Sequence, residues 1–567
     1  MIPAPIRTQV RAAIERAWAE AVRTGALPAL PGDATPPTVD VARPANADHG
    51  DLSTNLAMRL AKPYRKAPLE IATLLAAKLV RDGGIDGSPS PIEAAEVAPP
   101  GFLNIRLRPD ALATTIDSIV AEPDAWGWVQ PVELSRPRAV NVEFVSANPT
   151  GPLTIGNARG AFIGDLLSRV LAAGGQEVTR EYYFNDSGAQ VSHLGASVLA
   201  VRRGEPVPEE GYKGEYVETL AGELPGDVLA EATADGVDGV DAADVVGRWA
   251  AVRVRAGIEA SLEHLGVRFD VWTSEARLHD EGWVDRAVER LRERGHVYDL
   301  DGAAWFRSTA YGDDKDRVIV KSSGEPTYFA ADIGYVTEKF SRGFDHLIYI
   351  WGSDHHGTVA RVRNAADAMG YDREAVQMHL YSWVRFVRDG EEVSMSKRAG
   401  EFITLDDLLA EVGVDAARWF FASRGTTSAI DFDIELAKKQ SNENPVYYVQ
   451  YAHARIASIL RKAADAGLAP ASDVAGALTG PPEAALVRAV ARYPEVLADA
   501  VAAEETQGIT AYATELATAF HAFYRDARVV DMDAPERSAA RLAIARATQV
   551  TLASSLALLG ISAPDSM

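Results

Sequence analysis

A strand, a glycine-bearing loop and a helix follow one another in the first part of the chain, and this succession restricts the fold most. Residues 139–144 are largely apolar, which suits a strand that is buried in a parallel sheet. A loop with Pro and Gly follows at residues 148–156, and helical spacing then extends over residues 157–173 to Gly174-Gly175. This order is typical of the opening of a nucleotide-binding α/β sheet, so we expect such a sheet here.

A second unit of the same kind lies further along the chain. Residues 346–351 are an apolar strand, residues 352–357 a turn, and residues 358–369 a helix that ends at Gly370. Between the two units, residues 204–245 are acidic, Gly-rich and weakly periodic. We therefore expect a Rossmann-like domain that is interrupted by an insertion at about residues 190–290.

The length of 567 residues is too great for one ordinary domain, because a prior of roughly 150 residues per domain gives three or four. Residues 1–115 combine helical spacing with a short alternating strand at 101–107, which predicts a small α+β domain. Residues 116–407 hold the Rossmann-like domain. Residues 408–567 are Ala-rich with long helical periodicity, which predicts an all-α bundle.

Composition excludes several classes of protein. The chain has no cysteine, so disulfides, thiol catalysis and Cys-ligated zinc are excluded. Its formal net charge of −23 argues, taken alone, against nucleic-acid binding, which usually leaves a basic surface. Local basic groups nevertheless occur in the C-terminal part, at Lys438, Lys439, Arg455, Arg461, Lys462, Arg525 and Arg528.

The sequence predicts a cytoplasmic protein with no membrane segment. No apolar run approaches the roughly 20 residues that span a bilayer. Residues 1–22 carry charges among apolar residues, which favours an amphipathic helix over a signal peptide.

Two segments could carry chemistry. The first, Pro149-Thr150-Gly151-Pro152-Leu153-Thr154-Ile155-Gly156-Asn157-Ala158-Arg159-Gly160, puts small residues before a helix N-terminus, where free N–H groups can bind phosphate. Taken alone it fits a tight packed turn equally well. The second, Val393-Ser394-Met395-Ser396-Lys397-Arg398-Ala399-Gly400, is a cationic loop that could close over a triphosphate, although alone it fits a solvated surface loop better.

Together, the two segments resemble the paired motifs of class I aminoacyl-tRNA synthetases, His-Ile-Gly-His and Lys-Met-Ser-Lys-Ser. Five further runs resemble one family, the arginyl-tRNA synthetases, and this resemblance covers nearly the whole chain. These runs are Val142-Glu143-Phe144-Val145-Ser146-Ala147-Asn148, Glu181-Tyr182-Tyr183-Phe184-Asn185-Asp186, Tyr328-Phe329-Ala330-Ala331-Asp332, Trp351-Gly352-Ser353-Asp354-His355-His356 and Asn444-Pro445-Val446-Tyr447-Tyr448-Val449-Gln450-Tyr451-Ala452-His453-Ala454-Arg455.

The resemblance implies an enzyme that joins L-arginine to tRNA(Arg) through an arginyl-adenylate, with ATP and Mg²⁺, as a monomer. It implies that arginine is bound by Glu143, Asn148, Tyr328, Asp332 and His355. Carboxylates suit the planar, always charged guanidinium group, and Tyr328 and Asp332 would share a helix face. Three of these residues also have a plainer explanation: Glu143 could pair with a neighbouring Arg, Tyr328 could be core, and Asp332 could cap a helix.

The resemblance likewise implies the residues that bind ATP and tRNA. ATP would contact Pro152, Gly156, Gly352, Asp354, Met395 and Ser396, while Thr154, Asn157, Lys397 and Arg398 would act in catalysis. Mg²⁺ would arrive with the triphosphate rather than in a protein cage, so no metal ligands are predicted. tRNA would contact Phe102, Asn104, Tyr447, Tyr451, Arg455 and Arg528, although the tyrosines could equally be bundle core.

The chain departs from the paired motifs at several positions. Thr154 and Asn157 replace both histidines, and neither can become cationic. Ser394 replaces the first lysine of the second motif, although members of the family often lack that lysine. Arg398 or Arg159 could compensate for lost charge. The departures leave an alternative open: a synthetase paralogue with weakened or lost activation, acting as a tRNA- or arginine-binding regulator, or as an inhibitor-resistant or biosynthetic copy.

Overall fold

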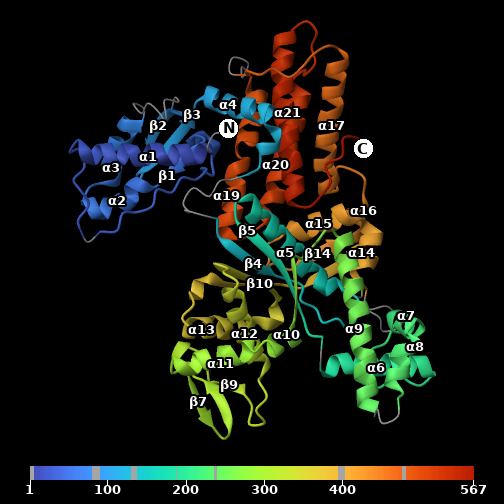
Figure 1. Ribbon diagram of the computed structural model, residues 1–567. Coiled ribbons are helices and arrows are strands. Elements are labelled where there is room, and N and C mark those ends of the chain that lie inside the picture. Colours follow the sequence, from blue (N-terminus) through green and yellow to red (C-terminus); the bar gives the residue numbers. More distant parts are fainter. Residues whose placement is uncertain are drawn as a thin grey trace.

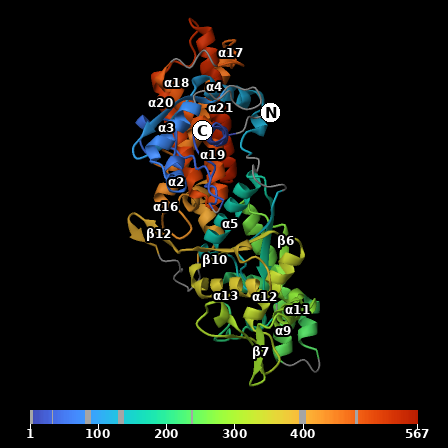
Figure 2. The same cartoon turned by 90° about the vertical axis from the view of Figure 1, so that its left-hand side faces the viewer.

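The structure is a computed structural model that describes residues 5–32, 34–79, 90–128, 137–186, 188–234, 239–393, 403–474 and 480–567. Two perpendicular views show an elongated molecule (Figure 1, Figure 2). The N-terminal domain and the C-terminal helices lie at one end and the central sheet in the middle. Residues 394–402, which contain most of the second predicted motif, lie outside the described residues.

A parallel sheet forms the centre of the molecule. In the described part of the chain it has five strands in the order β11-β10-β4-β5-β6, and every neighbouring pair is parallel. The strands are β4 (Ala139–Glu143), β5 (Glu177–Phe184), β6 (Val271–Ser274), β10 (His346–Gly352) and β11 (Val376–Tyr381). The predicted Rossmann-like fold is therefore confirmed, including both strand–loop–helix units.

Both faces of this sheet are covered, which explains why its strands are continuous apolar runs. Along β10, Ile348 and Ile350 pack into the core that includes α5 (Ile155–Ala173). The alternate residues Leu347 and Tyr349 pack into a second core with α12 (Tyr328–Ser341) and α13 (His356–Ala368). Since side chains of a strand alternate between faces, one apolar run serves two cores.

Helices interrupt the sheet between β5 and β6. They are α6 (Ala189–Arg203), α7 (Glu215–Glu223), α8 (Gly226–Ala232) and α9 (Gly239–His264). Helices α6 and α9 cross at backbone contact, because a Cβ on Gly195 would lie 1.9 Å from the carbonyl oxygen of Ala243. The weak periodicity of residues 204–245 did not predict these helices. A second set of elements precedes α12: α10 (Glu275–Asp280), α11 (Trp283–Glu293), β7 (Val297–Leu300), β8 (Ala303–Phe306) and β9 (Arg317–Val320).

The N-terminal domain is α+β, as predicted. Its antiparallel sheet has the order β1-β3-β2 and carries helices on one side. The elements are α1 (Ile6–Arg23), β1 (Leu52–Thr54), α2 (Leu56–Tyr64), α3 (Pro68–Leu79), β2 (Ile92–Ala98), β3 (Phe102–Leu107) and the connecting α4 (Pro109–Ala121). Ion pairs of 2.6 Å between Arg7 and Asp499 and 2.8 Å between Arg488 and Asp51 join this domain to the C-terminal helices.

The C-terminal part is helical, with one exception. Strand β14 (Ile430–Asp433) pairs in parallel with β12 (Val384–Arg388), which also pairs with the short β13 (Glu391–Glu392). The helices are α14 (Leu405–Val412), α15 (Val414–Ala422), α16 (Ile434–Lys438), α17 (Pro445–Asp465), α18 (Pro481–Ala491), α19 (Tyr493–Ala503), α20 (Gln507–Asp526) and α21 (Pro535–Leu558).

One helix departs from the expectation that the chain has no membrane-length apolar segment. The stretch Pro535–Leu559 is long and apolar enough to cross a bilayer, and 72% of its most apolar window is buried inside the protein. A core helix of a bundle has the same composition, because it is apolar all round.

A single carboxylate ties the C-terminal helices to the central sheet. Glu504, after α19, accepts hydrogen bonds of 2.7 Å from Nε2 of His346 and 2.8 Å from Nε2 of His379. Although burial raises it, these two bonds lower the pKa of Glu504 to about 2. Glu504 has a left-handed φ of 53°, a conformation in which glycine is favoured. The two hydrogen bonds of its side chain offset the cost of this backbone conformation.

We predict that Glu504→Gln lowers the free energy of unfolding at neutral pH and that this loss becomes smaller in acid. A carboxylate with a lowered folded-state pKa stabilises the protein above its unfolded pKa, and this contribution disappears as the pH falls toward about 2. The wild type should exceed the variant by up to about 3 kcal/mol at pH 6, with the difference shrinking below pH ~4. Urea unfolding across this range measures it. Glu505→Gln, at the exposed neighbouring position, is the control, and an equal loss in both variants would contradict the assignment.

Candidate active site

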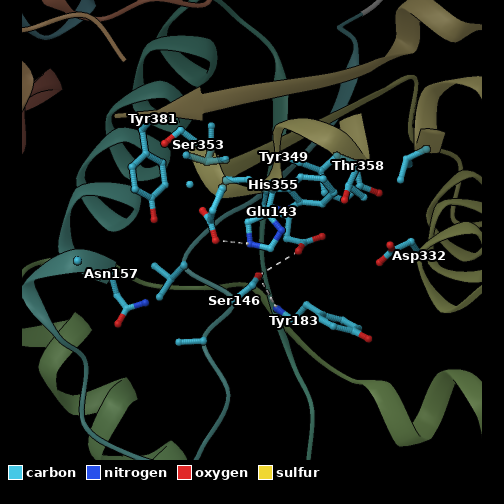
Figure 3. A pocket seen from close by; sticks show the side chains of 18 of the residues that line it. Glu143, Ser146, Asn157, Tyr183, Asp332, Tyr349, Ser353, His355, Thr358 and Tyr381 are labelled. Carbon is cyan, nitrogen blue, oxygen red and sulfur yellow. Dashed lines mark hydrogen bonds and ion pairs between the residues drawn. The ribbon is translucent and has the colours of Figure 1, made fainter. Parts of the chain in front are cut away.

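A cavity of about 710 Å³ opens at the carboxyl end of the central sheet. It lies where β4 and β10 are neighbours, and the chain leaves β4 in one direction and β10 in the other. This switch of direction is the place where open α/β sheets bind ligands. Figure 3 shows the cavity from close by, with Asn157 of α5 at one side and Asp332 of α12 at the other.

The cavity brings together residues that the sequence singled out from distant segments. Those that line it are Glu143, Gly156, Asn157, Tyr328, Asp332, Gly352, Asp354 and His355. Tyr328 and Asp332 both face it from the first turns of α12, as their spacing predicted. Asn148, Pro152 and Thr154 are not among its lining residues. Met395, Ser396, Lys397 and Arg398 lie outside the described residues.

Thr154 and Asn157 form the N-terminal cap of α5. The backbone N–H and the hydroxyl group of Thr154 donate hydrogen bonds of 3.2 and 2.9 Å to Oδ1 of Asn157. Such a box fixes the first turn of a helix. The segment after the second motif lies against this turn, since Thr154 pairs with Thr404 and the N–H of Ile155 donates to the carbonyl of Ile403 at 3.3 Å.

A buried ion pair neutralises the first carboxylate of the cavity. Glu143 accepts 2.7 Å from the ammonium group of Lys339 through Oε2 and 3.0 Å from the hydroxyl group of Ser146 through Oε1. The Lys339 side chain is fully buried. Its ammonium lies 4.2 Å from the ring centroid of Tyr335 and 4.0 Å from that of Tyr349, which stabilises the buried cation further. The plainer explanation from the sequence, that Glu143 pairs with a neighbouring Arg, is right that the carboxylate pairs with a cation but wrong about the residue, which is Lys339.

The second carboxylate is different, because Asp332 has no hydrogen bond or ion pair within the described part of the chain. Burial, together with the charges of Glu143 and Glu275, raises its pKa to about 7. Glu275 itself accepts a hydrogen bond of 2.8 Å from the hydroxyl group of Tyr183, another lining residue. An unpartnered carboxylate in a pocket with excess negative charge is poised to bind a cation.

Arg159 corrects one expectation from the sequence. Its guanidinium group donates to four backbone carbonyls, those of Ser382 (2.6 Å), Trp383 (3.2 Å), Gly425 (3.0 Å) and Ser428 (2.6 Å). Burial lowers its pKa to about 10, so the side chain is still charged near neutral pH. The expectation that Arg159 replaces lost charge in the site is wrong, because the group is buried and holds main chain instead.

The predicted tRNA-contacting residues lie away from this cavity. On α17, Tyr447 and Tyr451 stack at 6.3 Å, and the guanidinium of Arg455 lies 4.9 Å from the ring centroid of Tyr451. Arg528 is exposed and lies 3.4 Å from Asp531. On β3, Phe102 is exposed, whereas Asn104 is buried.

Sequence reasoning missed several residues that shape the cavity. They are Ser146, Tyr183, Lys339, Tyr349, Tyr381 and Trp383. Tyr183 lies in the run of residues 181–186 that resembles the arginyl-tRNA synthetases, so the sequence marked its neighbourhood. Lys339 carried none, since it lies on α12 and its partner Glu143 lies 196 positions earlier.

Comparisons with models of known protein families show to which class of protein the domains of this chain belong. The family model for the class I tRNA synthetase catalytic domain of arginine type, described as "tRNA synthetases class I (R), catalytic domain", matches residues 128–431. The arginyl tRNA synthetase N-terminal domain matches residues 5–107, and the DALR anticodon binding domain matches residues 449–567. The fold and the cavity are thus those of a class I aminoacyl-tRNA synthetase.

Similar whole proteins narrow the class to one family. The chain is 44% identical to an arginine–tRNA ligase of Citrifermentans bemidjiense and 42% identical to that of Bacillus subtilis, in each case over 94% of this chain and 95% of the relative. An arginyl-tRNA synthetase structure from Thermus thermophilus superposes with a TM-score of 0.76 at 25% identity, covering 98% of this chain and all of that one. The chain belongs to the arginyl-tRNA synthetase family.

We predict that Lys339→Met is strongly destabilising, because it leaves Glu143 buried without its cation. The free energy of unfolding should fall by about 3–5 kcal/mol. Urea unfolding measures it, and the double variant Lys339→Met/Glu143→Gln should recover part of the loss, since it removes the stranded charge. Lys321→Met, which breaks an exposed pair with Glu325, is the control. A loss below about 1 kcal/mol for Lys339→Met would show that the pair contributes no more than a surface pair.

Proposed function

We propose that this chain attaches L-arginine to tRNA(Arg) through an arginyl-adenylate, as a cytoplasmic monomer that uses ATP with Mg²⁺. Family membership carries the overall reaction. The assignment of individual residues rests above all on one observation, the unpartnered carboxylate of Asp332 in an acidic cavity at the sheet switch point. A bound guanidinium cation would supply the ion-pair partner that the Asp332 carboxylate lacks in the described chain.

Arginine would lie with its guanidinium group at the α12 side of the cavity. Asp332 would accept its N–H groups, and the exposed ring of Tyr328 would cover it. Glu143 is already neutralised by Lys339, so it would orient neighbouring groups more than bind the ligand. Lysine could not satisfy the same planar set of acceptors, and unmet buried polar groups discriminate strongly. Asn148 and His355 would bind the amino-acid end.

ATP would lie at the α5 side. A Cβ on Gly156 would meet only the Thr154 hydroxyl oxygen, at an ordinary 3.4 Å, so packing within the protein does not require glycine there. Close approach of a ligand is a better reason for it. Asn157 at the helix N-terminus, with Pro152, Gly352 and Asp354, would position the nucleotide. Met395, Ser396, Lys397 and Arg398 would contact the triphosphate, as the resemblance to the second motif implies. They lie outside the described residues, and Ile403, which follows them, accepts a hydrogen bond from the first turn of α5.

Mg²⁺ would enter with the nucleotide. Among the described residues no group of three or more His, Asp or Glu could hold a metal ion, and Mg²⁺ prefers phosphate oxygens and water. When bound, it would neutralise phosphate charge.

The chemistry needs no protein nucleophile. A carboxylate oxygen of arginine attacks the α-phosphorus of ATP, the bond to pyrophosphate breaks, and the 2′-hydroxyl group of the tRNA terminal ribose then attacks the adenylate and releases AMP. The protein positions the reactants and stabilises developing charge, with Thr154, Asn157, Lys397 and Arg398 in that role. The tRNA would contact the exposed Phe102 in the N-terminal domain and Tyr447, Tyr451, Arg455 and Arg528 in the bundle. Asn104 is buried, so it would support the strand beneath this contact instead of touching tRNA.

The decisive experiment is attachment of labelled arginine to tRNA by the purified protein, with Asp332→Ala beside it. The wild type should charge tRNA, and Asp332→Ala should lower kcat/KM for arginine about 100-fold or more, because it removes the partner of a desolvated charge. Asp299→Ala, an exposed aspartate on β7, is the matched control. Wild-type protein that binds tRNA without charging it would instead support a paralogue with lost activation.

The pKa of Asp332 predicts how arginine binding depends on pH. Only the ionised carboxylate attracts the guanidinium, and with a pKa of about 7 the ionised fraction rises about 10-fold between pH 6 and pH 8. Affinity for arginine, measured by isothermal titration with tRNA present, should rise by a similar factor over that range.

Asp332→Asn is the control for this pH dependence. It should bind weakly and with no such dependence, because the amide does not titrate. A pH profile shared by both proteins would contradict the role of Asp332.

A further inference from the structure

The cavity presents an aromatic ring that the proposed reaction has not used. In the described part of the chain ten large apolar side chains are exposed, and only Tyr328 and Trp383 among them line the cavity. The Trp383 side chain is 61% exposed. A large exposed indole at the edge of a polar pocket is a candidate contact for a ligand.

The main chain beneath this ring is held firmly. Arg159 donates to the carbonyl groups of Ser382 and Trp383 at 2.6 and 3.2 Å, and the N–H of Ser382 donates to the carbonyl of Thr426 at 3.0 Å. The Ser382 hydroxyl group donates to the carbonyl of Thr427 at 2.6 Å. Because the backbone is already held, only the two side-chain torsions of Trp383 lose freedom when a ligand covers the ring.

The chain that carries Trp383 approaches the cavity from the α5 side, where the proposed function places ATP. Trp383 follows the end of β11, where Tyr381 is the register partner of Gly352. The Tyr381 ring would lie 3.2 Å from a Cβ on Gly160, so this strand end packs directly on α5. Figure 3 shows Tyr381 on the side of Asn157, away from Asp332. The guanidinium-binding end is therefore not the part of the ligand that Trp383 would meet.

We propose that Trp383 is a stacking platform for an adenine base, a role that rests on the proposed function. Two substrates of that reaction carry adenine: ATP, and the 3′-terminal adenosine of tRNA. Base–aromatic stacking needs a flat face and no hydrogen-bond code, and this position offers an exposed indole on a main chain that is held in place.

The test compares Trp383→Ala and Trp383→Phe with Trp128→Ala, a tryptophan of almost equal exposure (62%) that does not line the cavity. Three quantities are measured: the affinity for ATP with tRNA present, as KM in pyrophosphate exchange and as an equilibrium dissociation constant, and the equilibrium affinities for full-length tRNA and for tRNA that lacks its terminal adenosine. Trp383→Ala should weaken one adenine-bearing ligand roughly 5- to 150-fold, while Trp383→Phe should keep most of the affinity because it keeps a ring.

The pattern of losses identifies the source of the base. A higher KM for ATP with both tRNA affinities unchanged assigns the ring to ATP. Loss of affinity for full-length tRNA, down to that of the truncated tRNA, assigns it to the terminal adenosine. If Trp383→Ala behaves like Trp128→Ala in all three measurements, the platform is refuted. Because tRNA binding is measured without charging, a wild type that fails to charge would refute the proposed function separately from the platform.

Discussion

The ion pair between Lys339 and Glu143 is the interaction on which the cavity depends. Two carboxylates at the end of a parallel sheet would repel each other, and a buried pair of like charges is unfavourable. The ammonium group on α12 removes that repulsion at Glu143 and is held over two tyrosine rings. The site therefore keeps one carboxylate satisfied and one, Asp332, without a partner in the described chain. This asymmetry is what gives the pocket a single preferred place for a cation.

A second set of contacts fixes the side of the cavity that α5 forms. The cap of α5 at Thr154 and Asn157, the pairing of Thr154 with Thr404, and the guanidinium of Arg159 all act on the same few turns of chain. They connect the first motif, the strand end after β11 and the segment after the second motif. Where the motif has two histidines, this chain has a capped helix start, so the geometry of the turn before α5 does not depend on those histidines.

The spacing of apolar residues and glycines along the chain predicted the elements that depend on nearby residues only. The strands β4 and β10 and the helix α5 follow from apolar runs and glycine positions, and Tyr328 and Asp332 share a face because of helical spacing. Pairing between residues far apart in the sequence could not be predicted from it. Nothing near Lys339 indicates that its partner is Glu143. Arg159 was expected to be available to a ligand, although it is buried. The helices α7 and α8 were missed because short helices depend on packing more than on their own periodicity.

The acceptors of Arg159 have a consequence for how this family can vary. All four are main-chain carbonyl oxygens, which every residue type possesses. Substitutions at positions 383, 425 and 428 therefore leave these acceptor oxygens in place, whereas a substitution at position 159 removes all four hydrogen bonds. The backbone that carries Trp383 is thus supported independently of the Trp383 side chain, so the identity of this ring can be changed without removing the support beneath it.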